Sequence, residues 1–293
     1  MVPVKRSYAF DRADVPTGEH YFIKLTYSFK DTHLPTDLQG RYFTSLFGPH
    51  TSALEVFFIK RKIKGPSWLT ISKPSRCPSS SQVSWCKLET NLESPKDIIV
   101  SPAGKVPAEI PQRVVAALNL KTVINHKDNI NEIASASVVY SRRVKWNTHE
   151  MLSHFSVVRK LEGGVFPAGF GPEVEKINDK MGAVVLNFES SERALLSCLM
   201  VKLYQLDPDV LVGHNISGFD LDVLLHRLQA CKVQSNQWSK IGRLRRSQIP
   251  RLTGGGNAFG SGAGPGHMAC IAGRLLCDTY ISSRELLKET SYS

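Results

Sequence analysis

The sequence predicts an α/β protein, α+β when the whole chain is counted, with an α/β domain at residues 106–293 and part of a β-rich domain at residues 1–105. Three observations predict this class. The 293 residues, 42% of them hydrophobic, suffice for one large domain or two ordinary ones. Short strand-like runs dominate the chain up to residue 73. After residue 105, three strand patterns are followed by a helix, a buried strand and a second helix.

Short apolar runs separated by Pro, Gly and Asp turns predict the elements of the first domain. Residues 21–27, 53–59 and 68–71 are each expected to form a strand. The turn-rich residues 74–82 are expected to form a surface loop. Residues 93–111 hold four prolines, which interrupt regular structure, so we expect the domain boundary near residue 105.

Strand-like runs predict three antiparallel strands at the start of the second domain. Residues 113–124 and 132–140 form the first pair, and the polar residues 126–129 between them predict a hairpin turn. Residues 154–159 are expected to form the third strand.

Two helices and a strand complete the predicted domain. Ser190 or Ser191 is expected to cap a helix, because a serine hydroxyl accepts a hydrogen bond from a free N–H of the first turn. The apolar face of this helix is formed by leucines at helical spacing, namely Leu195, Leu196, Leu199, Leu203 and Leu206. Residues 207–213 predict a turn and a buried strand, and residues 219–230 a second helix. This order of elements is that of the RNase H-like α/β nuclease fold.

Positive charge is in excess and is concentrated in one stretch of the chain. The 37 Lys and Arg residues against 26 Asp and Glu give a net charge of +11, which favours polyanionic partners, with a merely soluble basic surface as the alternative. No Asp or Glu lies between Asp222 and Asp278. From this stretch we expect nucleic-acid contacts by Trp238, Lys240, Arg243, Arg245, Arg246 and Arg251, with the tryptophan available for stacking.

Several other classes of protein are disfavoured. The chain starts without the apolar run of a signal peptide, and no stretch approaches the ~18 apolar residues that span a bilayer, so we expect a soluble, intracellular protein without a membrane partner. The six cysteines include no C-x2-C pair, which argues against a zinc site or a disulfide framework. The glycine-rich residues 254–266 predict a flexible loop, because their glycines do not follow the spacing of a phosphate-binding loop.

A polar motif is predicted where the buried strand ends and the next helix begins. Residues 213–222 read Gly-His-Asn-Ile-Ser-Gly-Phe-Asp-Leu-Asp and contain an Asn-x3-Phe-Asp pattern, with Asn215 and Asp220. This pattern resembles the second exonuclease motif of the family B DNA polymerases. Five separated stretches resemble replicative members of that family in the family's own order, namely residues 46–48, 61–69, 83–87, 207–215 and 238–246.

The resemblance implies an RNase H-like exonuclease domain, truncated at its C-terminal end and preceded by part of a β-rich N-terminal domain. The complete enzyme would be a nuclear, Mg²⁺-dependent polymerase that extends RNA primers at the initiation of DNA replication, together with primase and accessory subunits. For this fragment, the resemblance implies a scaffold that binds primer–template or single-stranded DNA and needs no cofactor. The polymerase palm of the family carries a pair of catalytic aspartates. The Asp-x-Asp pairs of this sequence, at residues 207–209 and 220–222, are explained by a turn and by the start of a helix, so a polymerase palm is not expected.

The nuclease chemistry of the family requires two divalent ions held by several carboxylates. An Asp-x-Glu pair on one strand supplies two of them, because residues i and i+2 share a face. No Asp-x-Glu occurs in this sequence, and the residues that match the family's pair are Asn119 and Lys121. An amide is a weak ligand and an ammonium group opposes metal binding. We therefore expect a degenerate site at Asn119, Lys121, Asn215 and Asp220, with no catalytic residue and no bound metal.

Other interpretations of these residues stay open. The N-terminal helix dipole by itself favours an aspartate at Asp220. An active 3′–5′ exonuclease would use Asp220 together with Glu132 or Asp278, and a module that binds only proteins would lack DNA affinity. His214 and His226 are expected to be ordinary hydrogen-bonded residues rather than zinc ligands. The arginines of the acid-free stretch would, on the rival interpretation, pair with acidic patches elsewhere in the full-length enzyme.

Overall fold

The structure, a computed structural model, divides into two compact units. It describes residues 1–7, 18–28, 30–48, 52–105, 107, 110–144, 152–245, 247–249 and 265–287. One unit comprises Met1–Pro74 and Leu92–Val106, and the other comprises Ser75–Asn91 and Pro107–Ser293. The segment Ser75–Asn91, which the sequence analysis assigned to the first domain, thus groups with the second unit.

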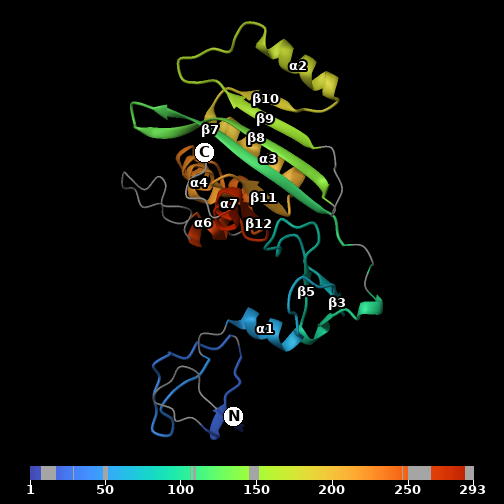
Figure 1. The fold of residues 1–293 in the computed structure, drawn as a ribbon, viewed down its shortest axis with the longest axis vertical. Coiled ribbons are helices and arrows are strands. Elements are labelled where there is room, and N and C mark those ends of the chain that lie inside the picture. Colours follow the sequence, from blue (N-terminus) through green and yellow to red (C-terminus); the bar gives the residue numbers. More distant parts are fainter. Residues whose placement is uncertain are drawn as a thin grey trace. The chain divides into compact units, whose positions relative to one another are not determined.

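Among its described residues, the first unit contains two small antiparallel ladders and one helix, of which α1 and β3 are labelled in Figure 1. Strand β1 (Val2–Arg6) pairs with β2 (His20–Lys24), and β3 (Leu69–Ile71) pairs with β6 (Ile98–Val100). Two 3-10 turns, η1 (Pro95–Asp97) and η2 (Ala103–Lys105), flank β6. The strand expected at residues 68–71 is confirmed, and β2 overlaps the one expected at residues 21–27.

The strand expected at residues 53–59 is wrong, because this segment forms helix α1 (Ala53–Arg61). Local capping explains the outcome. Ser52 Oγ accepts a hydrogen bond of 3.1 Å from Glu55 N, and Lys62 ends the helix in the left-handed conformation with φ 59°. A short apolar run does not distinguish a strand from a helix, so the caps and the basic last turn decide the structure.

A six-stranded mixed sheet forms the centre of the second unit, with the strand order β10-β9-β8-β7-β11-β12. Strands β7 (Arg113–Asn125), β8 (Ile130–Val144) and β9 (Ser153–Arg159) are antiparallel neighbours, as predicted, and the hairpin turn lies between β7 and β8. Strand β10 (Leu186–Glu189) runs parallel to β9. Strands β11 (Val210–Gly213) and β12 (Leu275–Asp278) continue the sheet parallel to β7.

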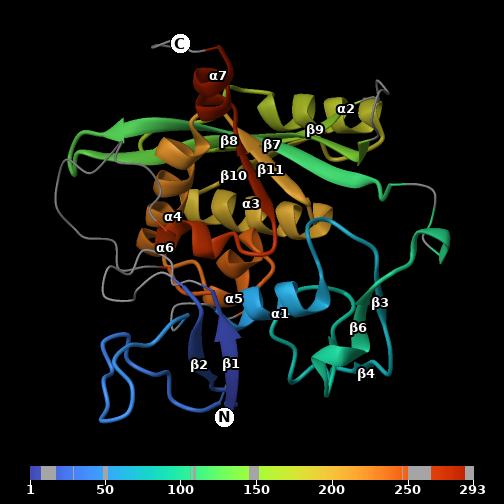
Figure 2. The ribbon, with the colours of Figure 1, turned by 60° about the horizontal axis from the view of Figure 1, so that its bottom comes forward.

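Helices cover both faces of this sheet (Figure 2). The two predicted helices, α3 (Glu192–Leu206) and α4 (Leu221–Ala230), lie on one face, and α7 (Thr279–Leu287) lies on the other. Ser191 caps α3 by accepting a hydrogen bond from Ala194 N, and all five leucines expected on the apolar face of this helix are buried. The remaining elements are α2 (Phe170–Met181), α5 (Ser235–Trp238), α6 (Pro265–Cys270), the π-turn η3 (Ile216–Asp220), the 3-10 turn η4 (Ser239–Ile241), and a ladder of β4 (Ser75–Arg76) with β5 (Thr90–Asn91).

Two expectations about loops and membranes can be compared with this fold. Of the glycine-rich residues 254–266, those before Pro265 lie outside the described residues, and α6 begins at Pro265. Within the described part of the chain, none of the helices combines the length and the apolar character needed to cross a bilayer.

Candidate functional site

Asn119 and Lys121 lie on the exposed face of β7. Burial alternates along this strand, so that Ala116, Leu118 and Leu120 enter the core while Asn119 and Lys121 face outward. The last paired residues of β7 and β11 are Ala117 and Val212. Asn119 and Lys121 therefore lie on β7 just beyond the end of β11, on one face of the sheet, as their i and i+2 spacing predicts.

The chain leaves β11 through a tight turn that carries the Asn-x3-Phe-Asp motif. Asn215 adopts the left-handed conformation with φ 56°, and the π-turn η3 follows it. A Cβ atom at Gly218 would overlap Oδ1 of Asn215, so only glycine allows the asparagine side chain to fold over this turn. The π-turn ends at Asp220, which is 6% exposed and directly precedes α4.

Asp278, at the end of β12, holds this turn in place. Its carboxylate accepts hydrogen bonds from Asn215 N at 3.0 Å, Ser217 N at 2.9 Å and Tyr280 N at 3.0 Å. Within the sheet, Asp278 is level with Gly213. One carboxylate thus fastens the N-terminal end of α7 and the turn after β11 to each other.

Asp220 has an unusually high pKa for a carboxyl group. Burial and, to a lesser degree, the nearby charge of Asp278 raise this pKa to about 6, while His214 acts in the opposite direction. His214 is exposed, and its Nδ1 lies 3.3 Å from Thr279 Oγ1. Its ring also makes an edge contact with Tyr280.

The residues at the ends of β11 and β12 do not fit a pair of divalent ions. Both oxygens of Asp278 are engaged by backbone N–H groups of the turn after β11. On β7, the exposed positions carry an amide and an ammonium group rather than carboxylates. Among the described residues, no group of three or more His, Cys, Asp or Glu side chains is arranged to hold a metal ion.

Glu132, a candidate carboxylate for an active nuclease, is committed to a buried network of charges. It forms an ion pair of 2.7 Å with Arg159, and Arg227 lies 3.9 Å away. A hydrogen bond from Asn125 lowers the pKa of Glu132, burial opposes this, and the two arginines lower it further. Because Arg227 also binds Glu192 at 2.5 Å, Glu132 belongs to a structural network that joins β8, β9, α3 and α4.

His226 lies beside Asp222 on α4, at 3.3 Å, as an ordinary hydrogen-bonded residue.

Two of the expected nucleic-acid contacts have another role in the structure. Trp238 is 7% exposed and belongs to the hydrophobic core, so its ring offers no face on which a base could stack. Arg243 forms ion pairs with Asp207 at 3.0 Å and Asp209 at 2.8 Å. Burial favours the core position of an aromatic ring, and the two carboxylates satisfy the guanidinium group, so both residues have partners within the chain, and the nucleic-acid contacts expected of Trp238 and Arg243 stay a prediction.

Lys240 and Arg245 lie against aromatic side chains of the same unit. The Lys240 ammonium is 4.5 Å from the centre of the Tyr204 ring and 5.2 Å from that of Trp85, and the Arg245 guanidinium is 4.8 Å from that of Trp85. Arg245 also donates to Gln82 Oε1 at 2.8 Å. These cation–π contacts hold the segment Ser75–Asn91 on its own unit. Arg246 and Arg251 lie outside the described residues.

Asp207, Asp209 and Arg274 form an ionic cluster that the sequence analysis missed. The side chain of Arg274 is 1% exposed and donates to Asp207 Oδ1 at 2.7 Å and to the backbone oxygen of Ile241 at 2.9 Å. Burial alone would raise the pKa of Asp207, but hydrogen bonds from Arg274 and Arg243 lower it overall. The signal in the sequence was the acid-free stretch itself, because arginines without local acids require carboxylates from another segment.

Comparison with known proteins agrees with this arrangement. The sequence pattern of the DNA polymerase family B exonuclease domain matches residues 44–293. The chain therefore belongs to the family B DNA polymerases, within the region of their exonuclease domain.

The relatives are more specific about the branch of the family. The chain is 61% identical to the DNA polymerase alpha catalytic subunit of Oryza sativa subsp. japonica over 100% of its own length, and 57% identical to that of Arabidopsis thaliana over the same share. It is 39% identical to the DNA polymerase alpha catalytic subunit of Xenopus laevis over 99% of its length. It covers 20%, 20% and 19% of these three proteins, so it spans about a fifth of the curated relatives that it matches.

The high pKa of Asp220 predicts a pH-dependent effect of removing its charge. The folded state binds the proton of Asp220 more tightly than the unfolded state, so the free energy of unfolding falls as the pH rises from about 4 to about 6. Asp220→Asn should therefore raise the free energy of unfolding by about 1 to 3 kcal/mol at pH 7.5, and by much less at pH 4.5.

Urea denaturation at the two pH values measures this difference. Asp179→Asn, at an exposed position of α2, is the matched control and should change little at either pH. If Asp220→Asn changed the free energy of unfolding equally at pH 7.5 and pH 4.5, this result would contradict a raised pKa of Asp220 in the folded state.

The buried position of Arg274 predicts a large loss of stability on truncation. Arg274→Ala removes the ion pair to Asp207 and leaves the carbonyl oxygen of Ile241 without its donor, so the free energy of unfolding should fall by about 3 kcal/mol. Arg193→Ala, at an exposed position of α3, should cost less than about 0.5 kcal/mol. Thermal or urea denaturation of both variants decides the point, and similar losses in the two would refute a special role for Arg274.

Proposed function

We propose that this chain is the exonuclease-like region of a DNA polymerase alpha catalytic subunit, has an RNase H-like fold, and acts as a DNA-binding scaffold without nuclease chemistry. The complete enzyme would extend RNA primers with Mg²⁺ in the nucleus, together with primase and accessory subunits. The observation that carries the proposal is the pair Asn119 and Lys121 on the open face of β7, where a two-metal nuclease requires carboxylates.

The RNase H-like assignment rests on the order and direction of the strands. Three antiparallel strands come first, and β11 and β12 then add in parallel on the far side of β7. Polar groups gather where β11 and β12 end, beside the point at which the strand order reverses. In sheets of this kind ligands bind at that edge, which supports an origin of this site as a nuclease centre.

The electrostatics of the site support a role without catalysis. The ammonium group of Lys121 would repel a divalent cation bound close to it. Even in water, two like unit charges 4 Å apart repel each other by about 1 kcal/mol. Asp220 and Asp278 remain as two carboxylates at the ends of β11 and β12, and they are the observation that favours the second candidate function, a residual nuclease. Asn215 N and Ser217 N donate hydrogen bonds to the two carboxylate oxygens of Asp278. Because these oxygens are already engaged, the hydrogen bonds count against a residual nuclease.

The first test is a nuclease assay. The chain should not hydrolyse 5′-labelled single-stranded DNA in Mg²⁺ or Mn²⁺, because Asn119 and Lys121 cannot complete a two-metal site. Product formation that depends on the metal and is lost in Asp220→Ala would establish the residual nuclease instead.

The second test measures how residues 119 and 121 affect metal binding. The double variant Asn119→Asp, Lys121→Glu makes this part of β7 more acidic, so its affinity for Mn²⁺ should rise by about tenfold or more over the original chain. Isothermal titration with Mn²⁺ measures the change. The double variant Lys176→Glu, Lys180→Glu on α2 also adds negative charge and should leave the affinity unchanged. An equal gain in both double variants would mean that these two residues do not lie at a former metal site.

The third test concerns DNA binding. The positive charge predicts weak, sequence-independent binding of a single strand, and Arg246 and Arg251 remain as candidate phosphate contacts. Replacing both by alanine should reduce the slope of log affinity against log salt by about 1.4, since each contact with a single strand contributes about 0.7. Fluorescence anisotropy with oligothymidylate measures this slope, with Lys176→Ala, Lys180→Ala as the charge-matched control. An unchanged slope would favour pairing of these arginines with acidic groups.

A further inference from the structure

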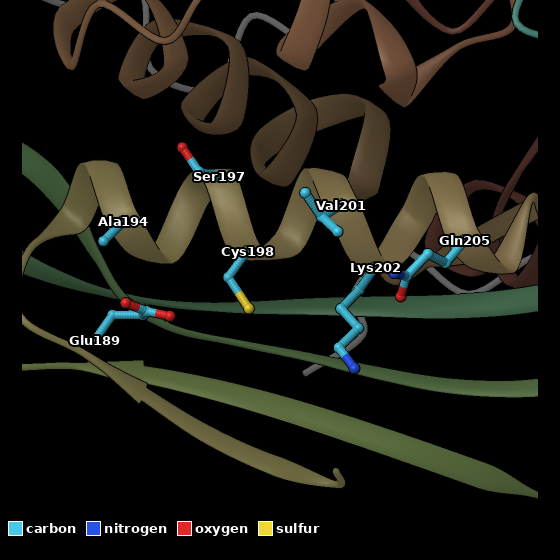
Figure 3. A pocket seen from close by; sticks show the side chains of 7 residues that line it. All are labelled: Glu189, Ala194, Ser197, Cys198, Val201, Lys202 and Gln205. Atoms are coloured by element: carbon cyan, nitrogen blue, oxygen red, sulfur yellow. The ribbon is translucent and has the colours of Figure 1, made fainter. Parts of the chain in front are cut away.

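A groove runs along the flank of α3, where this helix passes over the sheet (Figure 3). Its larger part has a volume of about 440 Å³. Cys198 and Lys202 point from α3 toward the strands, and Glu189 of β10 lies opposite them in the same view. A smaller part of about 80 Å³ shares Lys202 with the larger one and lies over Phe155 and Val184. The two parts share Lys202 and Gln205 along one flank of α3.

The charges of the groove are unequal at its two ends. At the β10 end, Glu189 accepts a hydrogen bond of 3.0 Å from Asn187, which also donates to Cys198 Sγ at 3.4 Å. At the other end lie Lys202 and Arg142, whose guanidinium is 5.5 Å from the centre of the Tyr140 ring. Among the described residues, Lys202 has no ion-pair partner. The acidic end is thus engaged by the chain itself, and the basic end is open to an anionic partner.

The sheet has a free edge beside the basic end of the groove. Strand β10 is short and pairs only with Ser156–Arg159 of β9, so Ser153–Phe155 has no neighbouring strand on that side within the described residues. Ser156 N donates to Val185 O at 2.7 Å, toward β10. Because backbone groups alternate in direction along a strand, those of His154 point to the same open side. A free edge of this kind pairs readily with an added extended chain.

We propose that this groove binds an extended, acidic segment of a partner protein, which adds to the sheet beside β9. In an extended chain, side chains two residues apart share a face, so an apolar residue and an acidic residue at that spacing both enter the groove. The apolar side chain packs on the exposed Val184, and the carboxylate meets Lys202 and Arg142. The backbone of His154 supplies hydrogen bonds to the segment. Nucleic acid fits this surface less well, because the carboxylate of Glu189 lines one end of the groove and repels phosphate groups.

A labelled peptide tests the proposal on the full 293-residue chain. The probe is fluorescein-labelled Val-Ser-Asp-Ser-Val-Ser-Asp-Ser, which places valine and aspartate on one face when extended. Fluorescence anisotropy should show saturable binding with a Kd on the order of 100 μM. Lys202→Glu should weaken binding by about tenfold or more. Lys180→Glu, the same charge change at an exposed position of α2, should leave binding unchanged.

Two further measurements separate strand addition from simple charge attraction. Bound peptide should slow amide hydrogen exchange at His154, and a probe with proline in place of its central serines should not bind, since proline cannot donate to a strand ladder. Equal losses in Lys202→Glu and Lys180→Glu, no saturation up to about 1 mM probe, or unchanged exchange at His154 would each overturn the proposal. Binding of the octanucleotide (dT)8 with the same dependence on Lys202 would show that the groove is a nucleic-acid site instead.

Discussion

The ionic cluster of Asp207, Asp209, Arg243 and Arg274 is the interaction on which the second unit depends. It lies at the start of β11 and joins it to the loop around η4 and to the residues that lead into β12. Asp209 also accepts from Val114 N at 2.9 Å, which fixes β11 beside β7. Buried guanidinium groups require both charge and hydrogen-bond partners, and here two aspartates and several carbonyl groups provide them. The ionic cluster therefore positions β11, and Asn215 and Asp220 follow the far end of this strand.

At that far end the carboxylate of Asp278 has a structural role. Asp278 fixes the turn after β11 through backbone N–H groups, and Asp220 is buried close enough to it that its own charge is disfavoured. A metal ion would relieve such repulsion, but Asn119 and Lys121 offer no carboxylate to help hold one. The site thus lies at a sheet edge of the kind at which ligands bind, and the proposal that it lacks nuclease chemistry rests on the missing carboxylates at positions 119 and 121.

The basic stretch shows how tertiary contacts redirect a charge pattern. Its composition indicated a polyanionic partner, yet Arg243 binds two aspartates, and Lys240 and Arg245 lie over aromatic rings of Tyr204 and Trp85. Trp238 fills the core rather than the surface. The chain thereby uses much of its local charge to attach the segment Ser75–Asn91 to its own unit, which the proline-rich boundary near residue 105 did not suggest.

The sequence by itself determined the elements whose signals are local or periodic. The β7–β8 hairpin, the Ser191 cap, the leucine face of α3 and the absence of an Asp-x-Glu pair were all readable from it, because alternation, helical spacing and residue identity do not depend on distant contacts. Local capping, which the sequence analysis did not weigh, decided that residues 53–61 form a helix. Only the tertiary structure decided that Arg243 and Arg274 share Asp207 and that β10 leaves part of β9 uncovered. These outcomes depend on capping geometry and on partners more than thirty residues away, where charge pairing and burial outweigh local preference.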